Sequence, residues 1–350
     1  MTPDTHSVVN DQTEGSKKFS FRRIVFYLVS LAVLVAVYLK FAEFDQLERA
    51  FLDSNKYLLA LAIVLQAGTY WGMALNYKFV LKMKGLAIQA SELYPLMFIV
   101  QFLNQALPSA GISGQVFFID YLKKKGMTLA EGFARVILEL TTLYMGFGLL
   151  FMISAFLGVQ QERLGHPEIA YFIYTFLVIA SFFLLVFLVF QKQTGIGWLH
   201  RFVERFQKKS QGDKQKGIAL FLTEISKNVS VEVLRKVRGA FTLAILAQLG
   251  VLMLDILTVY VLAIAIGVQV SFGVVFIVFT LTQFASMISF VPGSLGVFEG
   301  SMSLLFIGFG MASPAALTLT FLFRGIIFWL PMPIGWIIYR YYEKKMRLTA

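Results

Sequence analysis

The sequence has no cysteine, and its only three histidines stand far apart at positions 6, 166 and 200, in tail or loop positions. Without cysteine the chain has no disulfide bond, no thiolate metal ligand and no cysteine nucleophile. The scattered histidines argue against a histidine metal site, so we expect neither a metal nor another cofactor. The sequence also lacks the patterns GxxxxGKS/T and HExxH and an ordered Ser/His/Asp set. These absences predict that the protein is not an enzyme.

Charged residues are also scarce: 15% of the chain is charged and 58% is hydrophobic. Soluble domains contain about 25% charged and about 45–50% apolar residues. Apolar runs of 18 or more residues recur between Ile24 and Ile338, and such runs are long enough to form membrane-spanning helices. The sequence therefore predicts an all-α, polytopic membrane protein, with spans near 24–41, 57–79, 128–157, 170–191, 238–267 and 314–339.

The distribution of positive charge predicts the orientation of these spans. Of the 31 lysines and arginines, 25 fall in the N-terminal tail, the C-terminal end and the loops that would share one side of the membrane. Four fall in loops on the other side, and two lie within spans. Because positive residues concentrate on the cytoplasmic side, this asymmetry predicts cytoplasmic N- and C-termini. The longest polar segment, 192–237, carries a basic amphipathic pattern and is expected to lie at the cytoplasmic interface.

Two apolar segments are broken by proline and glycine at the depth where a membrane helix should continue. The first contains ALPSAGISGQVFF around Pro108, and the second contains FVPGSLGVFEGS around Pro292. The interval between the two prolines equals the interval between the Gly-Met dipeptides that begin at 126 and 310. Paired interruptions in the two halves of a membrane protein point to a transporter-type binding site. The alternative is that both are ordinary loops between spans. The expected turn residues are Pro108, Gly111, Gly114, Pro292, Gly293, Ser294 and Gly296.

The charge pattern also relates the two broken segments to each other. With the N-terminus in the cytoplasm, the broken pair at 92–122 begins and ends on the cytoplasmic side, and the pair at 273–310 begins and ends outside. The two copies are therefore predicted to be inverted repeats, each with a re-entrant helix pair. If each pair crosses fully instead, only the number of spans changes. We expect a disordered tail over 1–20 and one transmembrane domain over 21–345, which contains a first repeat at about 57–191, the connector 192–237 and a second repeat at about 238–340.

Ionisable side chains inside the expected spans are candidate functional residues, because charge at membrane depth is energetically costly. Arg135 lies seven residues past Thr128, a candidate helix N-cap, and Arg324 lies ten residues past Pro314, which suits a helix start. At 1.5 Å per residue these positions are roughly 10 and 15 Å deep, from opposite membrane faces. Arginine suits bidentate phosphate binding. We therefore predict that the two arginines receive an anionic headgroup at opposite ends of one path.

Acidic residues near these arginines leave a structural alternative open. Glu139 stands one helical turn after Arg135, and Asp255 is expected at a depth close to that of Arg324. Ion pairs between them would be architectural, although charges that line a path also pair when it is empty. Glu299, in the second broken pair, is placed to accept a proton, bind a cation or cap a short helix. The predicted path residues are Arg135, Glu139, Asp255, Glu299 and Arg324.

Two runs in the second half of the chain, PGSLGVFEG at 292–300 and LFRGIIFWLPMPIG at 322–335, carry a family resemblance. They resemble the lysylphosphatidylglycerol synthase transmembrane-region family, also described as flippase-like, which includes the membrane half of the multiple peptide resistance factor. The resemblance covers about residues 25–340. The family's Pro-Gly-Gly-Leu-Gly-x-x-Glu pattern falls on Pro292, Gly293, Leu295, Gly296 and Glu299, with Ser294 in place of a glycine. Its Arg followed by Trp-Leu-Pro-x-x-x-Gly falls on Arg324, Trp329, Leu330, Pro331 and Gly335.

The first half departs from the family pattern. Its proline and glycines at the turn remain, but Gln115 stands where an acid is common. Many members carry a Glu-Arg-x-x-Asp run, in which Glu139 matches the Glu while Leu140 and Leu143 replace the other two residues. These departures put a simple transfer of the substrate from other members in doubt.

The resemblance implies movement of a lipid or lipid-linked anionic molecule between leaflets by alternating access, in a bacterial inner membrane. It does not imply lysine transfer, which bifunctional relatives perform with a large soluble C-terminal domain that we do not expect here. The expected partners are membrane lipids of the anionic phospholipid or polyprenyl-phosphate type, without nucleic acid. A second copy of the chain and an envelope enzyme are further candidate partners. The alternatives are a non-transporting accessory protein of lipid or envelope metabolism, a small-solute transporter and an intramembrane enzyme.

Overall fold

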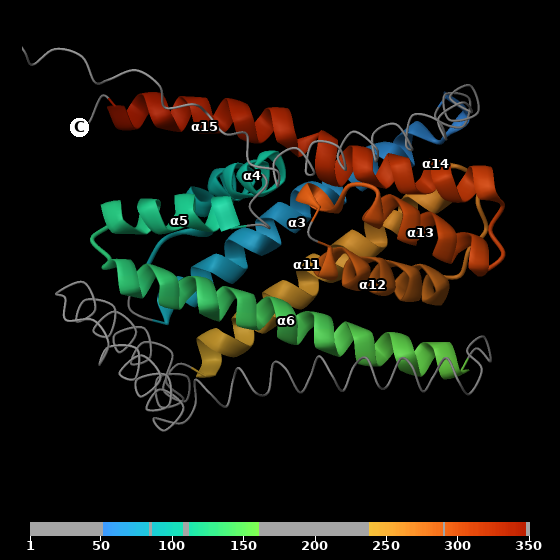
Figure 1. Ribbon diagram of the computed structural model, residues 1–350, viewed down its shortest axis with the longest axis horizontal. Coiled ribbons are helices and arrows are strands. Elements are labelled where there is room, and N and C mark those ends of the chain that lie inside the picture. Colours follow the sequence, from blue (N-terminus) through green and yellow to red (C-terminus); the bar gives the residue numbers. More distant parts are fainter. Residues whose placement is uncertain (1–51, 84–85, 108–111, 161–237, 290, 348–350) are drawn as a thin grey trace, which may run out of the picture. The chain divides into compact units, whose positions relative to one another are not determined.

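A computed structural model of the chain describes residues 52–83, 86–107, 112–160, 238–289 and 291–347. Every regular element in these residues is helical (Figure 1), which confirms the all-α prediction. The first half contains α3 (Lys56–Lys82), α4 (Ala90–Ala106), α5 (Ile112–Lys124) and α6 (Leu129–Gln160). The second half contains α11 (Arg238–Ala265), α12 (Phe272–Ile288), the short turn η2 (Pro292–Ser294), α13 (Val297–Gly308), α14 (Ser313–Arg324), η3 (Gly325–Trp329) and α15 (Pro331–Arg347).

Several of the sequence predictions lie outside the described residues. They concern the tail 1–20, the spans 24–41 and 170–191, the connector 192–237 and the turn residues Pro108 and Gly111.

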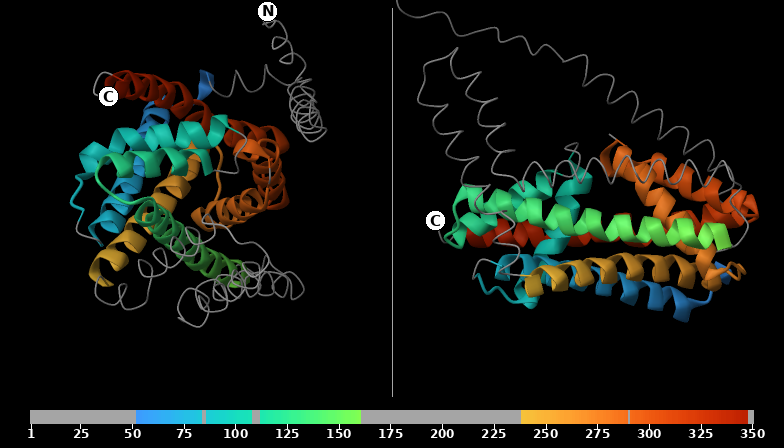
Figure 2. Two further views of the ribbon diagram at one scale, coloured as in Figure 1. Left: turned by 60° about the vertical axis from the view of Figure 1, so that its left-hand side comes forward. Right: turned by 90° about the horizontal axis from the view of Figure 1, so that it is seen from below.

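The helices α3 and α11 pack side by side and run antiparallel (Figures 1 and 2). At one end the backbone N–H of Asn55 donates to the carbonyl of Ala265, at 2.9 Å. Towards the other end the side-chain amide of Asn76 donates to the carbonyl of Ala244, at 2.8 Å. Asn55 also caps α3, because its side chain accepts hydrogen bonds from two N–H groups of the first turn. Since α3 also contacts α4 and α11 also contacts α12 and α14, this pair joins the two halves of the described chain.

Each broken segment contains two short helices: α4 and α5 in the first half, α12 and α13 in the second. The first pair is closed at its base, where Glu92 at the start of α4 meets the end of α5. The carboxylate of Glu92 accepts from Nζ of Lys125 at 2.6 Å and from the hydroxyl of Tyr121 at 2.8 Å. These bonds, from Lys125 first and Tyr121 second, hold the pKa of Glu92 below its usual range. The pair is therefore a helical hairpin with both of its outer ends together.

Gly114 is not part of the turn, contrary to the sequence prediction. It lies inside α5, where its backbone N–H donates to Oδ1 of Asn104 at 2.8 Å. A Cβ at Gly114 would collide with the backbone carbonyl of Val100 on α4. Glycine suits this position because the backbone of α5 lies directly against Val100 and Asn104 of α4, and not because the chain reverses there.

The helix order of the first half recurs in the second half. The helices α3, α4, α5 and α6 begin at positions 56, 90, 112 and 129, and the helices α11, α12, α13 and α14 begin at positions 238, 272, 297 and 313. The interval between equivalent helices is therefore constant to within one helical turn. The lengths of the first three also agree: 27 and 28 residues, 17 and 17, and 13 and 12. The predicted repeat is visible in the order and length of the elements. That the repeats are inverted and the helix pairs re-entrant stays a prediction.

The equivalent helices α5 and α13 also end in the same way. Gly126 and Gly310 both have a φ of +90°. The N–H of Met127 donates to the carbonyl of Leu122, and the N–H of Met311 donates to that of Phe306, both near 3.0 Å. Each end is a Schellman motif with glycine at the left-handed position.

Replacing Gly310 with alanine is expected to lower the free energy of unfolding by about 1–2 kcal/mol, because an L-residue is strained at this φ. A Cβ at Gly310 meets no atom within 4 Å, so conformation and not crowding causes the loss. The matched control is Gly308→Ala, which also meets nothing within 4 Å but is the last residue of α13, where no positive φ is required. It should leave stability unchanged or raise it by up to about 1 kcal/mol. Unfolding in mixed detergent micelles measures both, and equal effects would contradict the prediction.

Four of the described segments are long and apolar enough to cross a membrane: Lys56–Lys82, Leu129–Gly158, Arg238–Ala265 and Ser313–Lys344. They match the spans predicted near 57–79, 128–157, 238–267 and 314–339. Large apolar side chains are exposed on these helices, including Val64, Phe156 and Trp336. Many exposed apolar side chains on helices of this length are unfavourable in water and suit contact with lipid.

Candidate functional site: a buried ion pair at a helix break

The second helix pair turns at η2, and its backbone there takes left-handed angles. The φ angle is +60° at Gly293, +52° at Ser294 and +81° at Gly296. Two hydrogen bonds of 2.9 Å hold Ser294 in place: its N–H donates to the carbonyl of Val291, and its hydroxyl donates to that of Ser286. The serine that replaces the family's glycine thus meets part of the hydrogen-bonding need of the broken helix end with its own side chain.

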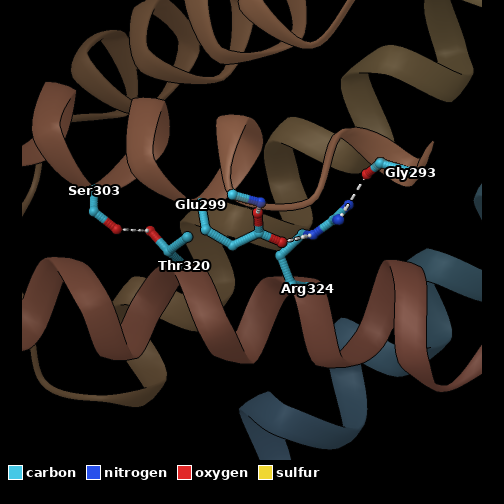
Figure 3. A network of polar contacts seen from close by, with 6 residues as sticks. Gly293, Glu299, Ser303, Thr320 and Arg324 are labelled. Atoms are coloured by element: carbon cyan, nitrogen blue, oxygen red, sulfur yellow. Dashed lines mark hydrogen bonds and ion pairs between the residues drawn. The ribbon is translucent and has the colours of Figure 1, made fainter. Parts of the chain in front are cut away.

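Glu299 in the first turn of α13 and Arg324 at the end of α14 form a buried ion pair (Figure 3). Nε of Arg324 donates to Oε1 of Glu299 at 2.5 Å, and Nη2 donates to the carbonyl of Gly293 at 2.8 Å. Oε2 of Glu299 accepts from the N–H of Gly296 at 2.6 Å, at the helix start, where a carboxylate is favoured. Glu299 is 8% exposed and Arg324 is 5% exposed. The ion pair therefore ties α14 to both the turn and the start of α13.

Two aromatic rings enclose the guanidinium of Arg324. Its central carbon, Cζ, lies 4.8 Å from the ring centroid of Phe298 and 4.3 Å from that of Phe328. Both contacts are cation–π interactions, which strengthen when water is excluded. The ring of Phe328 also lies directly against Gly293, where it would collide with any Cβ. The turn, the arginine and the aromatic ring are thus packed as one unit.

The site contains two of the five predicted path residues, Glu299 and Arg324. Of the predicted turn residues, Gly293 accepts a hydrogen bond from Arg324 (Figure 3) and Gly296 donates one to Glu299, with Ser294 between them in the chain. The capping role considered for Glu299 is confirmed, and the same carboxylate also holds the arginine. The helix start expected at Pro314 is confirmed as well, since α14 begins at Ser313.

Asp255 does not belong to this site, so the alternative in which it pairs with Arg324 is wrong. Its carboxylate accepts a hydrogen bond from the hydroxyl of Thr69, at 3.1 Å. Asp255 faces α3 across the antiparallel pair, whereas Arg324 reaches the turn at η2. Equal depth in the membrane does not bring two side chains together when their helices present them to different neighbours.

Arg135 is also separate, and it is 2% exposed. Its Nη1 donates to the carbonyl of Val80 in the last turn of α3, where helix carbonyls have no partner within the helix. Its Nε and Nη2 have no hydrogen-bond partner in the described part of the chain. No ion pair joins it to Glu139 in those residues, so the alternative in which the two pair one turn apart is wrong. The N-cap of α6 is as predicted. The carboxylate of Glu131 accepts from the backbone N–H of Thr128 at 2.9 Å, and the hydroxyl oxygen of Thr128 accepts from the backbone N–H of Glu131 at 3.2 Å.

Glu139 instead forms a polar cluster with Gln115 of α5 and Tyr77 of α3, which we call the Glu139 cluster. Nε2 of Gln115 donates to Oε2 of Glu139 at 3.3 Å. Nε2 of Gln115 also donates to the hydroxyl of Tyr77 at 3.1 Å, and Oε1 of Gln115 lies within accepting distance of the same hydroxyl, at 3.3 Å. Tyr77 is buried, and the other two are partly exposed. The cluster joins three helices around one carboxylate.

Sequence reasoning missed several residues that build these sites. Phe298 and Phe328 resemble ordinary apolar core residues, and Tyr77 is one of 14 tyrosines. Ser303 and Thr320, which bond each other at 3.1 Å between α13 and α14, gave no signal either. Gln115 did carry a signal, because the interval from Gln115 to Glu299 equals that between the two repeat prolines, so the two residues occupy equivalent positions.

Within the described ranges no group of three or more His, Asp or Glu is placed to hold a metal ion. The protein is a polytopic helical membrane protein. It has long apolar helices, exposed apolar side chains that suit contact with lipid, and a buried ion pair at a helix break. The chain belongs to the family described as "Lysylphosphatidylglycerol synthase TM region", whose model matches residues 24–335. The family resemblance of the motifs at 292–300 and 322–335 is thereby confirmed.

The chain is also similar along most of its length to curated archaeal proteins. A UPF0104 membrane protein of Methanothermobacter thermautotrophicus is 25% identical over 335 residues, which cover 93% of this chain and 95% of that protein. A UPF0104 membrane protein of Methanocaldococcus jannaschii is 24% identical, with 90% and 92% covered. One of Pyrococcus horikoshii is 24% identical, with 87% and 93% covered. These relatives support an integral membrane protein, and the bacterial inner membrane and the cytoplasmic termini stay predictions.

Proposed function

We propose that the protein moves a lipid or lipid-linked molecule with an anionic headgroup between the leaflets of its membrane. The observation that carries this proposal is the buried ion pair at the helix break. Arg324 holds a carboxylate through one edge of its guanidinium, and a phosphate presents the same kind of oxygen to the same donors. No acceptor in the described residues bonds Nη1 of Arg324, so a donor remains for a further anionic oxygen. In the proposal, Glu299 is the counter-ion that a headgroup displaces.

The movement is proposed to occur by alternating access between two inverted repeats. The recurring order of four helices supports it, and so does the antiparallel packing of the equivalent helices α3 and α11. The helices of the two broken pairs have 17, 13, 17 and 12 residues, or about 26, 20, 26 and 18 Å at 1.5 Å per residue. These lengths fall short of the roughly 30 Å hydrocarbon layer, which favours re-entrant pairs. The charge asymmetry supports cytoplasmic termini.

The proposal makes the protein a transporter and not a synthase, because the family match is to a transmembrane region. A second candidate is a non-transporting accessory membrane protein. The observation in its favour is that both carboxylate oxygens of Glu299 already have partners, as a purely architectural ion pair requires. The two candidates differ in whether removing the charges changes lipid movement in a folded protein.

The test is lipid movement in proteoliposomes that contain the purified protein and either fluorescent phosphatidylglycerol or fluorescent phosphatidylcholine. We expect the protein to accelerate the anionic lipid more than the zwitterionic one. The double variant Glu299→Gln/Arg324→Gln removes both charges but keeps hydrogen-bonding groups, so no unpaired charge is left buried. Its rate for the anionic lipid should fall by about tenfold or more, a barrier change of about 1.4 kcal/mol.

The matched control is Arg340→Gln, which removes an arginine whose side chain is 66% exposed near the end of α15. This variant should keep the parent rate, because an exposed ion pair contributes little. If the rate for the anionic lipid falls equally in both variants, the loss comes from removing positive charge in general and not from the ion pair. If the folded double variant moves lipid as fast as the parent, the ion pair is architectural and the accessory role is favoured.

A further inference from the structure

The carboxylate of Glu139 has no cationic partner in the part of the chain that the structure describes. Its side-chain hydrogen bond comes from the neutral amide of Gln115, and behind that amide lies the neutral hydroxyl of Tyr77. Arg135, on the same helix, is directed to a carbonyl of α3 instead. A carboxylate in a membrane span without a counter-ion is costly in its charged form, so it calls for an explanation.

Because the helix order repeats, the surroundings of Glu139 in the first half can be compared with those of the equivalent position in the second half. Gln115 and Glu299 occupy equivalent turns of equivalent helices, and Glu139 aligns with Arg324 to within one position. In the second repeat the acid on the broken pair meets a permanent cation on the following helix. In the first repeat an amide on the broken pair meets an acid on the following helix. The two equivalent sites therefore differ in the charge of the group that the carboxylate meets.

Among the residues that the structure describes, no lysine or arginine forms an ion pair or hydrogen bond with Glu139. The helix α6 packs against α3, α5, α11 and α12. Tyr77 and Tyr144 are the titratable side chains that interact electrostatically with Glu139, and both are neutral phenols. Residues 272–288 of α12 contain no titratable side chain. The charged groups of α3 and α5 are Lys56, Lys78, Lys82, Asp120, Lys123 and Lys124, and the remaining ones of α6 and α11 are Glu131, Arg135, Arg238 and Asp255. None of them forms an ion pair with Glu139 in the described residues.

We propose that Glu139 is a proton-binding site that couples lipid movement to a proton gradient, an inference that rests on the proposed function. When the site opens to water on one side, hydration favours the carboxylate; when it closes, the protonated acid is favoured. The step forms an O–H bond at a carboxylate oxygen of Glu139 as an O–H bond of hydronium breaks at one membrane face. Opening to the other face returns the proton to water. Gln115 stays bonded to Oε2, so Oε1 is the oxygen that takes the proton.

The first experiment measures protonation directly, without any lipid transport. Infrared difference spectra of the purified protein in lipid nanodiscs are recorded as the pH is lowered across the neutral range. Because Asp255 is a second carboxylate within a span, the measurement starts from Asp255→Asn. In that variant we expect a protonated-carboxyl band that grows as pH falls and is lost in Glu139→Gln/Asp255→Asn. The glutamine variant keeps the size and polarity of the side chain, so it separates protonation from packing. A band in Asp255→Asn that survives unchanged in Glu139→Gln/Asp255→Asn, or one that responds to sodium at constant pH, would overturn the proposal.

The second experiment places the parent and Glu139→Gln in proteoliposomes with a gradient of about one pH unit, a tenfold ratio of proton activity. We expect severalfold faster movement of anionic lipid in one gradient direction than in the other for the parent, and no difference for Glu139→Gln. If the parent moves lipid but ignores the gradient, coupling fails while the proposed function stands. If the parent moves no lipid, the proposed function fails, and with it the coupling; proton binding at Glu139 is then decided by the infrared spectra alone.

Discussion

Replacing Arg324 with alanine is expected to lower the free energy of unfolding by about 3–5 kcal/mol. The substitution leaves the carboxylate of Glu299, which is 8% exposed, without its cation in a dry site. It also removes the hydrogen bond to the carbonyl of Gly293 and empties the space between Phe298 and Phe328. Most of the loss should come from the stranded carboxylate, because an unpaired buried charge is far more costly than an empty space of this size.

A second variant, Glu299→Gln/Arg324→Met, tests how much of the lost stability comes from the unpaired carboxylate and how much from the empty space. The glutamine keeps a group that accepts the N–H of Gly296, and the flexible methionine fills the space between the two aromatic rings. We expect this double variant to regain about 2 kcal/mol or more over Arg324→Ala, although it lacks both charges. Denaturant titration in mixed micelles measures all three proteins, with Arg340→Ala as the exposed control. A double variant that is less stable than Arg324→Ala would show that the ion pair itself stabilises the fold.

The sequence predicts the local features of this site well, because they depend on neighbouring residues. Glycine and proline set the turn at 292–296, Glu299 follows at capping distance, and Thr128 and Pro314 start helices. The constant interval between the two copies of the broken segment likewise predicted that the helices of the two halves would correspond. Each of these inferences needs only the geometry of one or two consecutive elements.

The partners of the buried charges could not be predicted in the same way. Arg135 and Glu139 are one turn apart, yet Arg135 is directed to the end of α3 and Glu139 to α5. Asp255 matches Arg324 in expected depth, but it faces Thr69. Which neighbour a side chain meets depends on how each helix is rotated about its axis, and that rotation is set by packing along the whole helix. The first broken pair shows the same limit: the sequence pattern predicts a turn at Gly114, but this glycine lets α5 approach α4.

Replacing Gly335 with alanine is expected to lower the free energy of unfolding by about 1–3 kcal/mol, because the added methyl group overpacks a backbone contact. A Cβ at this position would collide with the backbone carbonyl of Phe98 and would lie 2.6 Å from Cβ of Phe102, both on α4. Neither atom belongs to the flexible end of a side chain, so α15 and α4 must separate to make room. The loss includes the contacts between these helices, such as that between Phe102 and Tyr339.

Gly325→Ala is the matched control, because it lies in the same continuous helical run and a Cβ there meets no atom within 4 Å. It should leave stability unchanged or raise it by up to about 1 kcal/mol. Equal effects of the two substitutions would mean that glycine acts in this run through backbone freedom and not through close packing.

With Gly114 against Val100 and Gly335 against Phe98, two glycines let other helices touch the backbone of α4. Close contacts of this kind favour association of helices in a membrane, where apolar burial alone gives little drive. The helix α4 also contacts η2, so loosening α4 should disturb the turn whose carbonyl holds Arg324. We therefore expect Gly335→Ala to slow lipid movement as well as to destabilise the protein, although Gly335 lies outside the ion pair.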